Sequence, residues 1–261
     1  MPSKQRLDIL TTERGLVATR SKAQGMIMAG EVLVNGTVAD KPGMKISTSA
    51  KISLKSKPRF VSRGGEKLAG ALLDFDFDVT GRICADVGAS TGGFTDCLLQ
   101  NGAARIYAID VGYGQIDYAL RRDERVLVME RTNARYVEKL DEQVNLVVVD
   151  ASFISLKILL PVIKNWLMPQ ADLLTLIKPQ FEAGKGEVGK GGVVRDVDVH
   201  IRVLEDITAF ASNHDFTVAG LTLSKLKGPA GNIEFLAWLS WGGDVDEIDI
   251  TTQIRQLISE E

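Results

Sequence analysis

The chain has 261 residues, of which 45% are hydrophobic and 25% charged, and its formal net charge is −3. These values are typical of a globular protein, and the length allows one full α/β domain with a small additional domain. No apolar run reaches the roughly 18 residues that span a bilayer, and no signal segment opens the chain. We therefore expect a cytoplasmic protein without a membrane partner. The two histidines, His200 and His214, form no metal-ligand cluster with the two cysteines, so the sequence predicts no metal.

The charges are divided unevenly along the chain. Residues 1–67 contain 13 Lys and Arg against 5 Asp and Glu, a local balance of +8, whereas the remaining residues contain 18 against 29, a balance of −11. A basic segment before an acidic body favours a polyanionic partner that binds through the basic part. A solvated surface of lysines is the alternative.

The basic segment is predicted to hold two helices and a small β-hairpin. Residues 5–14 and 18–29 have helical character, and Thr19 or Ser21 is the expected cap of the second helix. Short strands are predicted at 31–34 and 52–54, with the turn Asn35-Gly36 after the first of them. Cations throughout this module indicate that it docks on RNA.

The same segment resembles the S4-type RNA-binding domain. The resemblance covers about residues 5–55 and rests on Arg6-Leu7-Asp8, Gly15-Leu16-Val17, Ser21-Lys22-Ala23, Gly30 and Val34-Asn35-Gly36. By this resemblance, Arg6, Arg20 and Lys22 are the expected phosphate contacts. Residues 58–63 are the predicted linker, where Arg59 and Arg63 would continue the RNA-binding surface; a simple charged spacer is equally consistent.

Residues 83–98 predict the first βα unit of a nucleotide-binding α/β domain. An apolar run leads through an acid into a glycine-rich turn and then a helix, which Thr91 or Thr95 could cap. A second apolar run ends at Asp110, about 20 residues after the glycines, where such folds bind ribose hydroxyls.

The same turn argues against a dinucleotide. Ser90 stands where the dinucleotide fingerprint needs its middle glycine, and Asp86 would repel a pyrophosphate but attract a cation. We therefore predict S-adenosylmethionine (SAM), whose amino and sulfonium groups are positive; a plain structural turn is the alternative. The predicted cofactor-binding residues are Asp86, Gly88, Ala89, Ser90, Thr91, Gly92, Gly93, Phe94 and Asp110.

Two later apolar runs, 145–149 and 173–177, end in Asp150 and Lys178. Further strands are predicted at 216–224 and 234–239. Because ligands bind at the carboxyl ends of parallel strands, Asp150 and Lys178 should lie near the cofactor. They could form an ordinary ion pair. A lysine beside a carboxylate is also what methyl transfer to a 2′-hydroxyl needs, because it stabilises the developing alkoxide or accepts its proton.

Lys67 at a helix start and Glu234 at a strand entrance complete a Lys-Asp-Lys-Glu order that resembles the RNA 2′-O-methyltransferases of the FtsJ type. Over residues 4–242 the chain resembles the TlyA family. The motifs that carry this resemblance are the segments 62–68, 86–95, 130–135, 150–155 and 177–182.

The TlyA resemblance implies a fold, an activity and a set of roles. The fold would be α/β, a Rossmann-like class I SAM-dependent methyltransferase (residues 64–243) with a mostly parallel seven-stranded sheet, preceded by a small α+β S4-like domain (1–57) and followed by an acidic, helical tail (244–261). The activity would be methylation of a cytidine 2′-hydroxyl in 23S rRNA, and in some members 16S rRNA, with ribosomal subunits as partners. Lys178 would activate the hydroxyl, Asp150 would hold Lys178, Lys67 and Glu234 would orient the ribose, and Asn133 would lie near the adenine.

Three alternative functions remain open at this point. Family members are also labelled haemolysins, so one alternative is a membrane-lytic protein, although the interrupted apolar runs argue against it. Another is a non-catalytic RNA-binding assembly factor that keeps SAM only for its shape. A nicotinamide dehydrogenase is the weakest alternative, given Ser90 and the basic segment.

Overall fold

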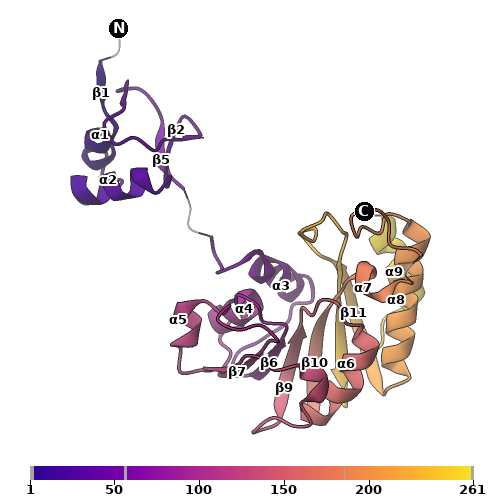
Figure 1. Cartoon of the computed structure of the whole chain (residues 1–261). Coiled ribbons are helices and arrows are strands. Elements are labelled where there is room, and N and C mark those ends of the chain that lie inside the picture. Colours follow the sequence, from indigo (N-terminus) through magenta and orange to yellow (C-terminus); the bar gives the residue numbers. More distant parts are fainter. Residues whose placement is uncertain (1–2, 56–57, 185, 260–261) are drawn as a thin grey trace. The chain divides into compact units, whose positions relative to one another are not determined.

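The computed structural model describes residues 3–55, 58–184 and 186–259, which form two compact units, Met1–Pro58 and Arg59–Glu261 (Figure 1). The ends of the predicted S4-like domain and of the predicted tail, residues 1–2, 56–57 and 260–261, lie outside the described residues. The boundary follows Pro58, so most of the predicted linker 58–63 is assigned to the second unit. Phe60 is buried there in the core, and the Val61 N–H donates to the Asp96 carboxylate at 2.8 Å.

The first unit contains two helices, α1 (Leu7–Glu13) and α2 (Arg20–Met28), and two small antiparallel sheets. Thr19, and not Ser21, caps α2, because its hydroxyl accepts the Lys22 N–H. The first helix begins two residues later than expected, since residues 5 and 6 belong to a strand. The strands are β1 (Lys4–Arg6) paired with β4 (Lys45–Ser47), and β2 (Val32–Val34) between β3 (Thr37–Val38) and β5 (Ile52–Leu54).

The second unit is built on one seven-stranded sheet with the order β11-β12-β10-β9-β6-β7-β8. Strand β12 runs antiparallel to both of its neighbours, and the other pairings are parallel, which confirms the predicted class I methyltransferase-like sheet. The strands are β6 (Ile83–Val87), β7 (Arg105–Ile109), β8 (Val126–Met129), β9 (Val144–Val149), β10 (Leu167–Ile177), β11 (Phe216–Leu223) and β12 (Phe235–Trp241).

Successive side chains of a strand point to opposite faces of the sheet, so the apolar strands present a hydrophobic surface on each face. Helices cover both of these faces. On β6, Cys84 packs in a core with α3 (Arg63–Asp74), α4 (Gly93–Gln100) and α5 (Tyr118–Arg121). Its neighbour Ala85 packs in the other core. That core contains α6 (Leu156–Ile163), α8 (Val197–Ser212) and α9 (Ile250–Ser259). Shorter pieces are α7 (Pro179–Glu182) and the 3-10 turns Ala134–Tyr136 and Lys164–Trp166.

Helix α9 lies inside the acidic tail 244–261. Its Ile254 and Leu257 are buried in the same core as α8, and Figure 1 shows α9 beside α8. The described part of the tail is therefore part of the second unit's fold.

Candidate active site

Four parallel strands, β6, β7, β9 and β10, bring their carboxyl ends to one edge of the sheet. In the register, Val87 pairs with both Ile109 and Val149, so the residues that follow these strands come close together. The backbone N–H of Asp150 donates to the Val87 carbonyl at 2.9 Å, which joins the loop after β9 to the loop after β6.

The glycine-rich loop passes against the backbone after β9. Gly88 has φ +87°, and a Cβ at this position would lie 2.7 Å from the Asp150 carbonyl oxygen, so only glycine fits here without a shift of the chain. The expectation that Thr91 or Thr95 caps the following helix is wrong. Gly92, in the left-handed conformation, is the N-cap residue of α4, and no side chain caps it.

Thr95 instead binds Asp86, which is fully buried. Asp86 Oδ2 accepts the Thr95 N–H at 2.9 Å and the Thr95 hydroxyl at 2.6 Å, whereas Oδ1 has no hydrogen-bond partner among the described residues. Burial raises the pKa of this carboxyl group to about 7. Asp86 lines neither of the cavities described below. A buried carboxylate with an unpaired oxygen would be stabilised by a cation nearby, which fits the amino group of SAM.

Asp110, directly after β7, is held in place by the backbone. Its Oδ2 accepts the Ser90 N–H at 2.7 Å, and its Oδ1 accepts the Gly112 N–H at 2.6 Å. An ionised carboxylate has about four acceptor positions, so hydrogen-bonding capacity is left for the hydroxyls of a ligand. The side chain is fixed before any ligand arrives.

Asp110 lines a cavity of about 380 Å³, and Asn133 lines the same cavity. Asn133 caps the 3-10 turn after β8, where its Oδ1 accepts the Arg135 N–H at 3.2 Å. The wall combines polar groups with apolar side chains such as Ile109 and Leu159, as small-molecule sites commonly do.

The four residues of the Lys-Asp-Lys-Glu order all line a second cavity, of about 550 Å³. They form two ion pairs. Lys178 Nζ lies 2.5 Å from Asp150 Oδ1, and the Lys67 ammonium pairs with the Glu234 carboxylate. Lys67, Lys178 and Glu234 are buried, whereas the Asp150 side chain keeps 23% of its surface exposed.

The two cavities adjoin. Gly88, Ser90, Asp150 and Ser152 line both of them, so a ligand in the first cavity and a ligand in the second would meet beside Asp150. Six of the predicted loop residues, Gly88, Ala89, Ser90, Thr91, Gly93 and Phe94, line the larger cavity.

Ser152 is a site residue that the sequence analysis did not single out. Lys178 Nζ donates to its hydroxyl at 3.0 Å and lies 3.4 Å from the Asp150 carbonyl oxygen. Lys178 is therefore held by three oxygen atoms on one loop. Ser152 falls inside the segment 150–155, but a lone serine in a loop gives no signal of its own.

The five predicted RNA contacts are divided between the two units. In the first unit, Arg6 and Arg20 both pair with the buried Asp8, and Lys22 is exposed on α2. In the second unit, the Arg59 guanidinium lies 4.7 Å from the Phe60 ring centroid, and Arg63 lines the larger cavity. Arg63 also donates to the Lys227 carbonyl at 3.0 Å.

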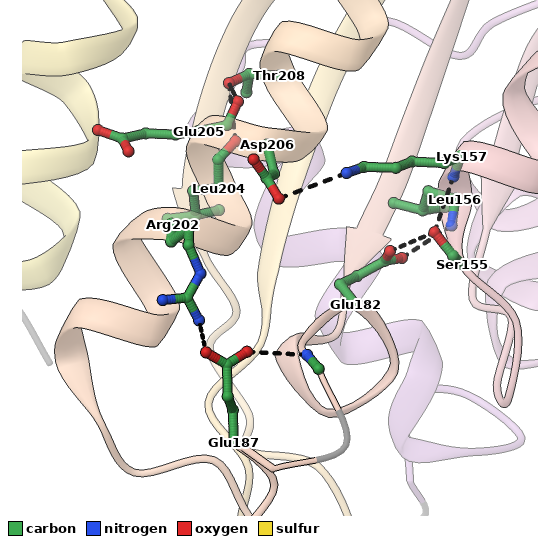
Figure 2. A network of polar contacts seen from close by, with 11 residues as sticks. Ser155, Leu156, Lys157, Glu182, Glu187, Arg202, Leu204, Glu205, Asp206 and Thr208 are labelled. Carbon is green, nitrogen blue, oxygen red and sulfur yellow. Dashed lines mark hydrogen bonds and ion pairs between the residues drawn. The ribbon is translucent and has the colours of Figure 1, made fainter.

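The segment after Lys178 is anchored to α6 and α8, and Figure 2 shows the network. Glu182 accepts the Ser155 hydroxyl at 2.6 Å and the Leu156 N–H at 2.8 Å. Further along the chain, Glu187 pairs with Arg202 of α8. These contacts fix the course of the chain on both sides of residue 185, which lies outside the described residues.

Among residues 3–55, 58–184 and 186–259, no helix is long and apolar enough to cross a bilayer. In the same residues, no group of three or more His, Cys, Asp and Glu side chains is placed to hold a metal ion.

Comparison with known proteins confirms both resemblances. Residues 60–241 match the FtsJ-like methyltransferase family, and residues 5–52 match the S4 domain. A protein of Bacillus subtilis (strain 168), provisionally named rRNA methyltransferase YqxC, is 50% identical over 248 residues, which cover 94% of this chain and 88% of that protein.

Two further similarities extend over nearly the whole chain. The 16S/23S rRNA (cytidine-2′-O)-methyltransferase TlyA of Mycobacterium tuberculosis (strain ATCC 25618 / H37Rv) is 45% identical over 243 residues, covering 92% of this chain and 91% of that protein. A solved structure from Streptococcus thermophilus, provisionally described as a hemolysin, has a TM-score of 0.75 at 45% identity and covers 100% of this chain and 96% of that chain.

Proposed function

Since this chain belongs to the FtsJ-like methyltransferase family and to its S4-containing TlyA group, we propose that it transfers a methyl group from SAM to a cytidine ribose 2′-hydroxyl of ribosomal RNA. We expect 23S rRNA as a substrate, with 16S rRNA as a second one, as the name of the Mycobacterium tuberculosis relative describes for that protein. The observation that carries the proposal is the meeting of two cavities at Asp150, one lined by Asp110 and the other by two lysine–carboxylate pairs.

We assign the cofactor to the glycine-rich loop and the smaller cavity. Asp110 would accept hydrogen bonds from the ribose hydroxyls of SAM, and Asn133 would lie near the adenine. Asp86, which is fully buried and lines neither cavity, would attract the positive amino group of SAM by its charge and not by direct contact. When bound, SAM supplies a methyl group on a positively charged sulfur, which a neighbouring oxygen nucleophile can attack.

Lys178 is the residue that activates the hydroxyl in this proposal. Its ammonium group is fixed by Asp150 and Ser152 and lies in the wall of the larger cavity. A charged group fixed in this way stabilises the negative charge that develops on the 2′-oxygen, without reorganising during the reaction. As the bond between the 2′-oxygen and the methyl carbon forms, the bond from that carbon to sulfur breaks and leaves a neutral thioether. The hydroxyl proton passes to the Asp150 carboxylate, because the ammonium group of Lys178 cannot accept it. Acid–base assistance of this kind contributes on the order of 10²–10⁴ in rate.

The Lys67–Glu234 pair would orient the ribose. Both side chains are buried in the wall of the same cavity, so their charged ends have fixed positions. A substrate held by fixed groups reacts as if its partner were highly concentrated, because the orientation is set before the reaction. We place the RNA itself on the basic first unit, through Arg6, Arg20 and Lys22, and on Arg59 and Arg63 of the second.

The direct test is transfer of labelled methyl groups. The full-length protein is incubated with methyl-labelled SAM and with 30S or 50S subunits that lack the modification. We expect label in rRNA as 2′-O-methylcytidine, and at least a 100-fold lower rate for Lys178→Ala. Lys157→Ala is the matched control, because Lys157 pairs with Asp206 on the surface, away from both cavities.

The binding of SAM is measured separately by calorimetry. If SAM binds but neither subunit is methylated, the assignment of the substrate is wrong. If SAM does not bind, the assignment of the glycine-rich loop is wrong as well. A leakage assay with liposomes tests the lytic alternative, which predicts equal leakage by wild type and Lys178→Ala.

A further inference from the structure

Asp8 is an unusual residue of the first unit because its carboxylate is completely buried. Arg6 binds it with two parallel bonds, Nε to Oδ1 at 3.0 Å and Nη2 to Oδ2 at 2.9 Å. Arg20 Nε donates to Oδ2 at 2.9 Å, and Gln24 Nε2 donates to the same oxygen at 2.8 Å. The hydrogen bonds from Arg6, followed by those from Gln24 and Arg20, hold the pKa of Asp8 well below its usual range, so the carboxylate stays charged.

The two arginines approach Asp8 from different elements. Arg6 is the last residue of β1, and Arg20 is the first residue of α2. Their side chains keep 41% and 52% of their surface exposed, although each uses one edge of its guanidinium to bind Asp8. Within the described residues, no protein acceptor is found for the two terminal nitrogens of Arg20. The cluster of Asp8, Arg6 and Arg20 therefore combines a buried carboxylate with guanidinium groups that are partly exposed at the surface.

We propose that Asp8 is the positioning residue of the RNA-binding surface: it holds Arg6 and Arg20 together so that their remaining N–H groups form a preformed site for an RNA phosphate. The inference rests on the proposed function, since it requires the first unit to bind RNA. Arginine binds phosphate best when its planar group presents two donors at once. The three side chains keep a net charge of +1, which suits an anion.

Asp8 would strengthen phosphate binding by preorganising the two arginines. A free arginine side chain loses rotamer entropy when it is fixed. Because Asp8 fixes both arginines in the free protein, less of this cost falls on binding, and more of the contact energy appears as affinity. If Asp8 were only a structural ion-pair partner, it would join β1 to α2 without increasing the affinity for RNA.

The two explanations predict opposite results for Asp8→Asn. Removing a negative charge from a basic surface strengthens RNA binding if only net charge matters. If Asp8 positions the arginines, the same substitution weakens binding. Asp40→Asn is the matched control, because it removes one charge from an exposed position of the same unit.

Binding of full-length wild type, Asp8→Asn and Asp40→Asn to unmodified 50S subunits is measured at several KCl concentrations. We expect at least tenfold weaker binding for Asp8→Asn, with a shallower salt dependence, and equal or tighter binding for Asp40→Asn. In methyl-transfer assays, Asp8→Asn should raise KM for the subunits and leave kcat unchanged. Equal or tighter binding by Asp8→Asn overturns the proposal alone, whereas failure of wild type to bind overturns the proposed function and this inference together.

A second substitution keeps the test decisive if Asp8→Asn unfolds the first unit, which circular dichroism would show. Arg20→Lys keeps the charge but removes the planar donor group, so we expect several-fold weaker binding. Its control is Lys51→Arg, at an exposed position of the same unit that has no part in the proposed site, and it should bind like wild type. Wild-type affinity for Arg20→Lys would overturn the proposal.

Discussion

Lys67 and Glu234 are 167 residues apart in the sequence, yet they form an ion pair that is almost entirely buried in the wall of the larger cavity. A buried pair loses the hydration of both charges, so its contribution to stability is small or unfavourable compared with apolar residues of the same size. Removing one partner is a different matter, because it leaves the other charge buried and unpaired.

Glu234→Gln should therefore destabilise the second unit and abolish most activity. We expect a loss of about 3–5 kcal/mol in the free energy of unfolding. The double variant Lys67→Met/Glu234→Gln should recover part of this stability and stay inactive, since the ribose-orienting groups are gone. Urea unfolding followed by tryptophan fluorescence measures the effect, because all three tryptophans, Trp166, Trp238 and Trp241, lie in the second unit.

The exposed pair Lys157–Asp206, at 3.5 Å, is the control for this prediction. Lys157→Ala should change the stability by less than about 1 kcal/mol, as exposed ion pairs do. A double variant as unstable as Glu234→Gln alone would show that an unpaired Lys67 is not the cause of the destabilisation.

Gly88→Ala tests the close approach of the glycine-rich loop to Asp150. The new Cβ would lie 2.7 Å from the Asp150 carbonyl oxygen, so the loop and Asp150 must move apart. We expect a loss of about 1–3 kcal/mol in stability and at least tenfold weaker SAM binding, measured by calorimetry.

Gly81→Ala separates this steric effect from backbone strain. Gly81 has φ +74°, close to the +87° of Gly88, but a Cβ there would meet nothing within 4 Å. It should lose stability through strain alone and bind SAM like wild type. Equal SAM affinities for the two variants would mean that the contact with Asp150 does not matter for the cofactor.

The sequence predicted β7, β9 and the last part of β10 because each is an apolar run that is followed directly by a charged residue. Strands β1 and β4 escaped the prediction, since Lys4–Arg6 and Lys45–Ser47 are short and largely polar, and their pairing depends on contacts far apart in the chain. The predicted cap of α4 was wrong for a similar reason. Threonine is a residue type that often caps helices, but the Thr95 hydroxyl donates a hydrogen bond to the buried Asp86.

Some residues of the candidate site could be predicted from the sequence, and others could not. Asp110, Asp150 and Lys178 could be predicted from the residues, because a charged side chain at the end of an apolar strand points to a ligand site in a parallel sheet. The pairing of Lys67 with Glu234 was reached only through a family resemblance, since no local pattern connects a helix start to a strand so distant. Ser152 could not be predicted, because its contact with Lys178 depends on the path of one loop.

Ser152→Ala should lower kcat and leave SAM binding unchanged. The substitution removes the hydroxyl that accepts a hydrogen bond from Lys178 Nζ at 3.0 Å, while the ion pair with Asp150 remains. A hydrogen bond to a charged group contributes about 1.5–3 kcal/mol, so we expect a decrease in kcat of roughly tenfold to a hundredfold. Single-turnover methylation of 50S subunits measures it, and Ser155→Ala, which removes a hydroxyl bound to Glu182, is the control. A wild-type kcat for Ser152→Ala would show that Asp150 alone positions Lys178.

Asp86 should make the stability of the ligand-free second unit depend on pH. Its pKa in the folded protein is about 7, against an ordinary value of 3.8, because burial disfavours the charged form. Below pH 3.8 both the folded and the unfolded states hold the proton, so the contribution of Asp86 to stability is fully present. Between pH 3.8 and 7 only the folded state keeps the proton, and stability falls by up to about 1.4 kcal/mol per pH unit.

Urea unfolding at pH 5, 6, 7 and 8 tests this directly. The free energy of unfolding of wild type should fall toward pH 7 relative to that of Asp86→Asn, and Asp244→Asn, at an exposed position, should keep the wild-type slope. Because a cation near Asp86 lowers its pKa, SAM binding near pH 7 should release a proton in wild type and not in Asp86→Asn. Calorimetry in two buffers with different ionisation enthalpies detects that proton. An identical pH dependence in wild type and Asp86→Asn would mean that the buried carboxylate is already ionised, and equal proton release would place the cationic end of SAM away from it.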